Sequence, residues 1–291
     1  LSIVGLQALA SHGRDLLFLF VFAFAARDID IKAIGKIFLW TLSISISIVA
    51  LLSINGFIED VVYRGGGEWY RPVRRTLGFS NPNALALYVL ALLYACFIVF
   101  ESKLKTLLVI IVTALTAFIL SGSRGLLLGV FSLFASYYIF SRCSKRTRNY
   151  ILFFFPLVAF IDIAFFYQFS FGPIESRVDR LSSFRFSYVW PVLQDTPITL
   201  FGSTSIFTEN SNPFDNSYAW FLLVYGIAGT MILLMSIFFG LFRNSGNIKI
   251  LELCSAICII GLVESKMSDP VMSFPLIKII FDHLHARFSV E

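Results

Sequence analysis

Long apolar runs separated by short polar stretches make up most of this 291-residue chain. A helix needs about 20 apolar residues, within a range of about 17 to 25, to cross the hydrocarbon core of a membrane. By that measure nine segments are predicted to be spanning helices: 14–26, 33–54, 84–100, 106–120, 125–140, 151–167, 218–242, 250–264 and 271–284. From Ser43 to Ile48, serine and isoleucine alternate with the period of a strand. A lone strand would leave its backbone unpaired in lipid, so a helix is expected there.

The longest polar interruption in this pattern runs from residue 168 to residue 217. A loop of that length within a helical array is usually functional, and its aromatic content argues against disorder. From Arg177 to Leu193, apolar residues recur at three- and four-residue steps: Val178, Leu181, Phe184, Tyr188 and Val192. This spacing predicts an amphipathic helix in the membrane interface, which we expect to act as a lid. The polar side of that helix carries Arg177, Arg180 and Arg185.

Composition agrees with a membrane protein. Hydrophobic residues make up 57% of the chain and charged residues 14%, whereas a typical soluble domain has about 25% charged residues. The mean hydropathy is +0.82. We therefore predict an all-α helix bundle that forms a single integral membrane domain over residues 1–291, embedded in a lipid bilayer. The sequence begins at Leu1 and not at a methionine, so the expected bundle can include further helices before Leu1, and no signal peptide can be read from the sequence.

The distribution of Lys and Arg predicts the orientation. Loops 27–36, 101–105, 141–149 and 243–249, with the tail from Asp282, hold 12 such residues over 41 positions. The alternate loops 55–83, 121–124, 168–217 and 265–270 hold nine over 89 positions. Short loops rich in positive charge stay on the cytoplasmic side, so the long loops are expected to face outward. The net charge of +5 therefore reflects topology, and without a basic stripe interleaved with aromatic residues no nucleic acid partner is expected.

The outward loops carry an unusual number of arginines. Eight of their nine cations are Arg, and Arg71, Arg74 and Arg75 lie within five residues. The guanidinium group is planar and always charged, and it grips phosphate through two parallel hydrogen bonds, which lysine does not do. The alternative is that these side chains anchor the protein by reaching toward lipid headgroups.

Three outward segments are candidate sites. In Asn81-Pro82-Asn83, Asn83 is expected to cap the following helix and Pro82 to set its entry geometry. The break at 121–125, Ser-Gly-Ser-Arg-Gly, offers free backbone N–H groups beside Arg124, which suits an anion. A plain turn between helices is the alternative. The third segment ends the long loop with Asp215, Asn216, Ser217 and Tyr218, ahead of a helix that contains Gly226 and Gly229.

Metal sites are not indicated. Cys254 and Cys258 share a helix face without matching His or carboxylate residues, so we interpret them as buried packing. Asp28 and Asp30 are interpreted as a solvated helix end on the cytoplasmic side. His283 and His285 do not share a helix face. Neither a metal nor another cofactor is expected.

Five motifs in order resemble the O-antigen polymerase and O-antigen ligase superfamily. They are Arg75-x-x-Gly78-Phe79-x-Asn81-Pro82-Asn83, Ser121-Gly122-Ser123-Arg124-Gly125, Arg185 through Trp190, Pro197 with Gly202, and Asp215-Asn216-Ser217-Tyr218 followed by Gly226 and Gly229. The resemblance covers residues 70 to 242. It implies a metal-independent glycosyltransferase in the bacterial cytoplasmic (inner) membrane that polymerises the repeat units of a surface polysaccharide, O-antigen or capsule, on the outer face.

The resemblance also implies substrates and residue roles. Donor and acceptor are oligosaccharides on undecaprenyl diphosphate, and a flippase and a chain-length regulator of the same pathway are expected partners. Arginines hold the diphosphate, with Arg124 and Arg185 catalytic and the others binding: Arg71, Arg74, Arg75, Arg177 and Arg180. Asn81, Asn83, Trp190, Asn216 and Tyr218 are expected to contact substrate. We expect Arg75, Arg124 and Arg185 to converge on one outward cavity.

One position departs from the ligase-like pattern, in which a His precedes Asn-x-Tyr. Here Asp215 occupies that position, which favours the polymerase branch over a ligase that transfers glycan to a lipid acceptor. Asp215 is the candidate general base, or the group that orients the acceptor hydroxyl. An arginine of the same loop would instead make it a structural partner.

A transporter or flippase is the alternative from another class. Glu264, Lys266 and Asp269 near a weak span could form an ion path, because ionisable groups within membranes are often functional. No inverted repeat supports this reading, and a transporter should hold its charges at mid-membrane. A membrane scaffold would leave the outward arginines unexplained.

Overall fold

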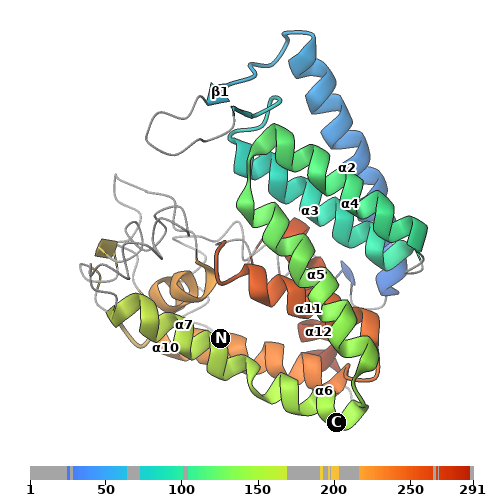
Figure 1. Ribbon diagram of the computed structural model, residues 1–291. Helices are drawn as coiled ribbons and strands as arrows, with labels where there is room; N and C mark the ends of the chain where they lie inside the picture. Colours follow the sequence, from blue (N-terminus) through green and yellow to red (C-terminus); the bar gives the residue numbers. More distant parts are fainter. Residues whose placement is uncertain are drawn as a thin grey trace. The chain divides into compact units, whose positions relative to one another are not determined.

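The computed structural model describes residues 25–26, 29–63, 73–100, 104–168, 191–192, 196, 198–202, 216–264, 267 and 269–288. These residues are mostly helical, with one short pair of strands (Figure 1). The chain divides into two compact units, Asp28–Tyr138 and Leu1–Arg27 with Ile139–Glu291. We refer to them as the α2–α5 unit and the α6–α12 unit. The single membrane domain expected from the sequence stays a prediction.

In the described part of the α2–α5 unit lie α2 (Ile31–Ile54), α3 (Pro82–Val99), α4 (Leu104–Ser121) and α5 (Arg124–Arg142), whose last turn belongs to the other unit. Helix α3 packs between α2 and α4, as Figure 1 shows. Its Leu90, Tyr94 and Phe97 are fully buried and supply the core. Gly129 of α5 lies against Leu90, where a larger residue would not fit.

A short antiparallel ladder closes the loop between α2 and α3. Strand β1 (Val62–Tyr63) pairs with β2 (Arg74–Arg75), so that Val62 lies opposite Arg75 and Tyr63 opposite Arg74. Strand β2 also packs against α4. Because successive side chains of a strand point to opposite faces, the two arginines project in opposite directions.

The described residues of the α6–α12 unit form α6 (Lys145–Phe153), α7 (Phe155–Gln168), α10 (Ser217–Arg243), α11 (Ile248–Ile260) and α12 (Pro270–Phe288). Helix α10 is central, because it contacts α6, α7 and α12, while α11 packs on α12. Pro275 lies inside α12, two residues after the non-helical Ser273, where the helix is kinked.

Helix α10 is interrupted at Gly226, whose φ is 69°. Ile227 and Ala228 donate their backbone N–H groups to the carbonyls of Thr199 and Leu200, at 3.1 and 3.0 Å. The segment 198–202 thus supplies the hydrogen bonds that the interrupted helix cannot form.

The helical fold class expected from the apolar runs is confirmed, and each predicted segment from 33 onward overlaps a helix. Residues Ser43 to Ile48 are helical, as expected. The prediction of a loop at 141–149 is wrong, because α6 begins at Lys145. Ser144 caps this helix, because its Oγ accepts the Thr147 N–H at 3.2 Å. A serine before a helix is a recognisable N-cap signal, but the basic residues that follow it led to the prediction of a loop. The predicted helix at 14–26 lies outside the described residues apart from Ala25 and Ala26.

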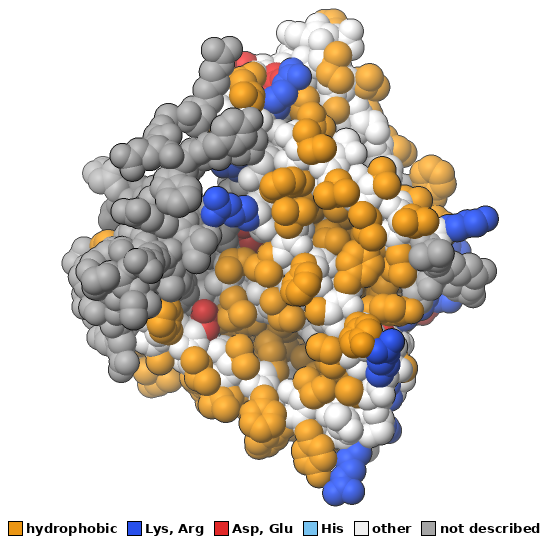
Figure 2. All heavy atoms as spheres, in the orientation of Figure 1, with side chains coloured by type: hydrophobic (Ala, Val, Ile, Leu, Met, Phe, Trp, Pro, Cys, Tyr) orange, Lys and Arg blue, Asp and Glu red, His pale blue; other side chains and the backbone are white. Residues whose placement is uncertain are grey.

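In the described part of the chain, five helices are long and apolar enough to cross a membrane. They are Ile31–Ile54, Pro82–Val99, Arg124–Arg142, Lys145–Phe165 and Ser217–Arg243. Large apolar side chains of these helices, such as Trp40, Phe131 and Ile232, are exposed. Figure 2 shows apolar side chains across much of the described surface. Such a surface fits lipid better than water.

Candidate functional site

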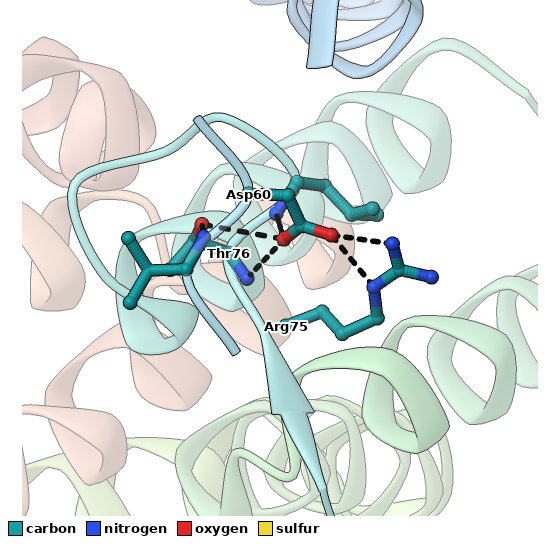
Figure 3. A network of polar contacts seen from close by, with 5 residues as sticks. Asp60, Arg75 and Thr76 are labelled. Atoms are coloured by element: carbon teal, nitrogen blue, oxygen red, sulfur yellow. Dashed lines mark hydrogen bonds and ion pairs between the residues drawn. The ribbon is translucent and has the colours of Figure 1, made fainter. Parts of the chain in front are cut away.

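A polar network in the α2–α5 unit is organised around Asp60, which lies between α2 and β1 (Figure 3). Its Oδ1 accepts the backbone N–H groups of Thr76 and Leu77, at 3.1 and 2.9 Å. Its Oδ2 accepts from Arg75 Nε at 2.7 Å and pairs with Nη2 of the same guanidinium at 2.5 Å. One carboxylate thereby holds both the turn after β2 and the Arg75 side chain.

The environment of Asp60 keeps it ionised. Partial burial acts to raise its pKa, but the hydrogen bonds from Leu77, Arg75 and Thr76 and the positive charge of Arg75 together lower the pKa below its ordinary value of 3.8. Leu77 has a φ of 47°, which is uncommon for a residue other than glycine. Its N–H bond to Asp60 supports that conformation.

Arg74 connects three parts of the α2–α5 unit. Its Nε donates to the Ser121 carbonyl at 2.7 Å, and its Nη2 donates to Asn83 Oδ1 at 2.6 Å. A Cβ at Gly122 would lie 2.8 Å from Arg74 Cγ, so only glycine admits this approach. The loop before α3 and the break between α4 and α5, which the sequence marked as separate candidate segments, therefore meet at Arg74.

The structure corrects the cap of α3. Asn81, and not Asn83, is the N-cap residue, since its Oδ1 accepts the Ala84 N–H at 2.8 Å. Pro82 occupies the first helical position, where its missing N–H costs nothing, and this places the cap one residue before it. Asn83 is consequently free to bind Arg74.

The break between α4 and α5 is shorter than expected and consists of Gly122 and Ser123. The Ser123 N–H donates to Ser121 Oγ at 3.2 Å. Arg124 is the first residue of α5 and is exposed. Arg75 has a side chain that is 49% exposed and binds Asp60 through one edge of its guanidinium. Among the residues that the structure describes, its Nη1 has no hydrogen-bond partner, so this atom can donate to an anion.

A second polar cluster, in the α6–α12 unit, is centred on Asn216. This fully buried residue caps α10, because its Oδ1 accepts the Ala219 N–H at 2.7 Å. Its Nδ2 donates to Asp162 Oδ2 at 2.7 Å and to the Leu262 carbonyl at 2.9 Å. Both hydrogens of the amide predicted to contact substrate are therefore engaged within the protein.

The residues that follow Asn216 tie the start of α10 to the segment after α11. Ser217 Oγ donates to the Glu264 carbonyl at 2.5 Å and accepts from the Met267 N–H at 3.2 Å. The buried Tyr218 donates its hydroxyl to the Cys258 carbonyl at 2.7 Å. Cys254 and Cys258 are buried, which confirms their interpretation as packing residues.

Two carboxylates of these clusters were not among the residues singled out from the sequence. Asp162 is the sole charged residue between Arg148 and Glu175, a signal that could have identified it. Asp60 carries no comparable signal, because its partners lie 15 to 17 residues further along the chain.

Several predicted site residues lie outside the described residues: Arg71, Arg177, Arg180, Arg185, Trp190 and Asp215. The predicted interfacial helix also lies there, except for Pro191 and Val192. Convergence of Arg185 with other arginines stays a prediction. Comparison of the chain with models of protein families, with curated proteins and with solved structures finds no match.

Proposed function

We propose that the protein is a metal-independent glycosyltransferase that polymerises undecaprenyl-diphosphate-linked repeat units on the outer face of a bacterial cytoplasmic membrane. The observation that carries the proposal is the junction at Arg74, where two motifs of the resembling family meet in one polar network. Arg75 and Arg124 lie beside that junction in the chain, and both are exposed enough to reach a ligand.

The chemistry of the reaction fits such arginines. When the donor loses its sugar, negative charge develops on the diphosphate that departs. Guanidinium groups stabilise that charge without a metal, through charge-assisted hydrogen bonds. Asp60 holds Arg75 by one edge and limits the side-chain freedom that binding would otherwise have to remove.

The membrane arrangement is part of the proposal. Nine spans place the loops that contain Arg75, Arg124 and Asp215 on the outward side, following the density of Lys and Arg in the alternate loops. Asp215 either takes the acceptor proton or orients the acceptor, and the helix from Arg177 to Leu193 excludes water from the donor. The aspartate at position 215 favours polymerase over ligase.

The direct test uses the full-length protein in membranes that contain the host's lipid-linked repeat units. We expect the units to lengthen into polymer, and Arg75→Ala and Arg124→Ala to slow lengthening by at least tenfold at equal expression, in line with the loss of about 1.5 kcal/mol or more per charged hydrogen bond. Arg146→Ala is the matched control, because Arg146 is an exposed arginine that contacts Tyr150 on α6. Absence of lengthening with wild-type protein, or normal rates in both variants, would contradict the proposal.

Transport is a second candidate, favoured by charged side chains inside the α6–α12 unit. Glu252 of α11 and Lys278 of α12 are buried, and Lys278 pairs with Asp282 at 2.5 Å. Buried ionisable groups in membrane helices often line a substrate or ion path. A flippase would move lipid-linked sugar between leaflets without lengthening it, so leaflet-specific detection in the same membranes separates the two functions.

A further inference from the structure

Asp162 is a carboxylate in an otherwise apolar helix. It lies on α7, within the segment Lys145–Phe165 that is long and apolar enough to cross a membrane. An acidic residue near the middle of such a helix costs about 2.5 to 3.5 kcal/mol on insertion scales and less near its end. Asp162 precedes the last residue of α7 by six positions, or about 9 Å along the helix axis. Ionisable residues within membrane-spanning segments are often functional, which makes Asp162 a candidate.

The orientation of Asp162 is set by a partner that is itself immobilised. Asn216 binds the Ala219 N–H through its oxygen, and the Leu262 carbonyl and Asp162 Oδ2 through its nitrogen. These three bonds admit one orientation of the amide, because a flipped amide would place a donor against the Ala219 N–H. The Asp162–Asn216 bond, 2.7 Å long, therefore directs the carboxylate as well.

The two carboxylate oxygens of Asp162 differ in their hydrogen bonding. Among the residues that the structure describes, Asp162 has one hydrogen-bond partner, Asn216, and that partner uses Oδ2. Asp162 is partly exposed, whereas Asn216 is fully buried. A partly exposed carboxylate that is anchored through one oxygen can accept a proton or a hydroxyl hydrogen bond through the other.

Asp162 lies at the junction of two packed helices. It belongs to α7, and its partner Asn216 is the N-cap residue of α10, which packs on α7. Asn216, itself one of the predicted substrate contacts, thus joins Asp162 to the start of α10.

We propose that Asp162 is a catalytic carboxylate that accepts the proton of the attacking sugar hydroxyl. The assignment rests on the proposed glycosyltransferase function. The hydroxyl oxygen of the acceptor forms a bond to the anomeric carbon of the donor while the bond from that carbon to the diphosphate oxygen breaks. The electron pair of the broken bond leaves with undecaprenyl diphosphate, and the hydroxyl proton passes to Asp162 Oδ1.

The test compares Asp162→Asn, Asp162→Glu and wild-type full-length protein in membranes that contain the host's lipid-linked repeat units. The rate of lengthening, the midpoint of thermal unfolding and the binding of undecaprenyl diphosphate are measured for each. Asn at position 162 can still accept from Asn216, so the fold should persist. Asp30→Asn is the matched control, because Asp30 is likewise an aspartate that accepts one hydrogen bond, in its case from the backbone N–H of Lys32 at the start of α2.

We expect Asp162→Asn to lengthen repeat units at least a hundredfold more slowly, the effect typical of a lost general base. Its affinity for undecaprenyl diphosphate should stay within twofold of wild type. Asp162→Glu keeps a carboxylate at a shifted position and should retain about a tenth of the wild-type rate. If Asp162→Asn does not fold, a folded Asp162→Glu variant with the full wild-type rate would contradict the assignment. Near-normal lengthening by Asp162→Asn would overturn the assignment and leave the glycosyltransferase function intact. Absence of lengthening with wild-type protein would instead remove the proposed function itself.

Discussion

Neighbouring arginines on β2 have different tasks because they project from opposite faces of the strand. Arg74 turns toward the helices, where it donates to the Ser121 carbonyl and to Asn83. Arg75 turns toward Asp60 and keeps about half of its side chain exposed. We infer that Arg74 holds the loop in place and that Arg75 is the arginine available to a ligand.

Substitution of these two arginines should separate stability from binding. Arg74→Ala leaves the Ser121 carbonyl and Asn83 without their partner, and we expect the free energy of unfolding to fall by about 2 kcal/mol. Arg75→Ala removes a half-exposed ion pair and should cost less than about 1 kcal/mol. Thermal unfolding of the purified protein in detergent measures both. Equal losses from the two variants would refute this division of roles.

The lowered pKa of Asp60 predicts a dependence of stability on pH. A carboxylate whose pKa is lower in the folded state stabilises that state fully above its ordinary pKa of 3.8. That contribution disappears as the pH falls through the lowered folded-state value. The difference in unfolding temperature between wild type and Asp60→Asn should therefore be clear at pH 7 and shrink below about pH 4. Glu59→Gln, at the exposed neighbouring position, is the control, and a difference that grows toward acid pH would contradict the prediction.

At the scale of single elements, apolar runs predicted where helices lie but not how they are interrupted. Gly226 lies within an apolar run. The carbonyls that accept the unpaired backbone N–H groups at this interruption belong to residues 199 and 200, which are too distant in the sequence for a periodicity to reveal. The position of the α3 cap was readable, because Pro82 marks the first helical residue and Asn81 precedes it. The bond from Arg74 to Ser121 spans 47 residues, so no local pattern could indicate it.

The break in α10 predicts a sharp contrast between two glycines. Alanine at Gly226 would have to adopt a φ of 69° and would place its Cβ against Gly202 N and the Leu200 carbonyl. We expect Gly226→Ala to lower the free energy of unfolding by roughly 3 kcal/mol, from the backbone conformation and the overlap together. Gly246→Ala is the control, since a Cβ there meets nothing within 4 Å. Similar unfolding temperatures for the two variants would show that the break can rearrange at little cost.

At the scale of the whole molecule, the five long apolar helices among the described residues and their exposed apolar side chains support a membrane protein, while orientation depends on the charges of its loops. Four basic residues lie in 141–149, and the structure places three of them, Lys145, Arg146 and Arg148, on α6. The rule that Lys and Arg mark the cytoplasmic side still applies to these helical residues, because that rule counts positive charges near the ends of spanning segments. We therefore expect the start of α6 to be cytoplasmic.

A native cysteine reports this orientation. Cys143 lies between α5 and α6 and is partly exposed. Cys96 on α3 is also partly exposed and is therefore replaced by serine in every protein tested, whereas Cys254 and Cys258 are buried and should not react in the folded protein. In intact spheroplasts, we expect Cys143 to react with a membrane-permeant maleimide and not with an impermeant one. Three predicted spans lie between Phe57 and Cys143, so the two residues are expected on opposite sides of the membrane. Phe57 is 79% exposed. In a Cys143→Ser background, Phe57→Cys should therefore react with the impermeant reagent. Impermeant labelling of Cys143, or protection of Phe57→Cys, would reverse the orientation and with it the outward position of Arg75 and Arg124.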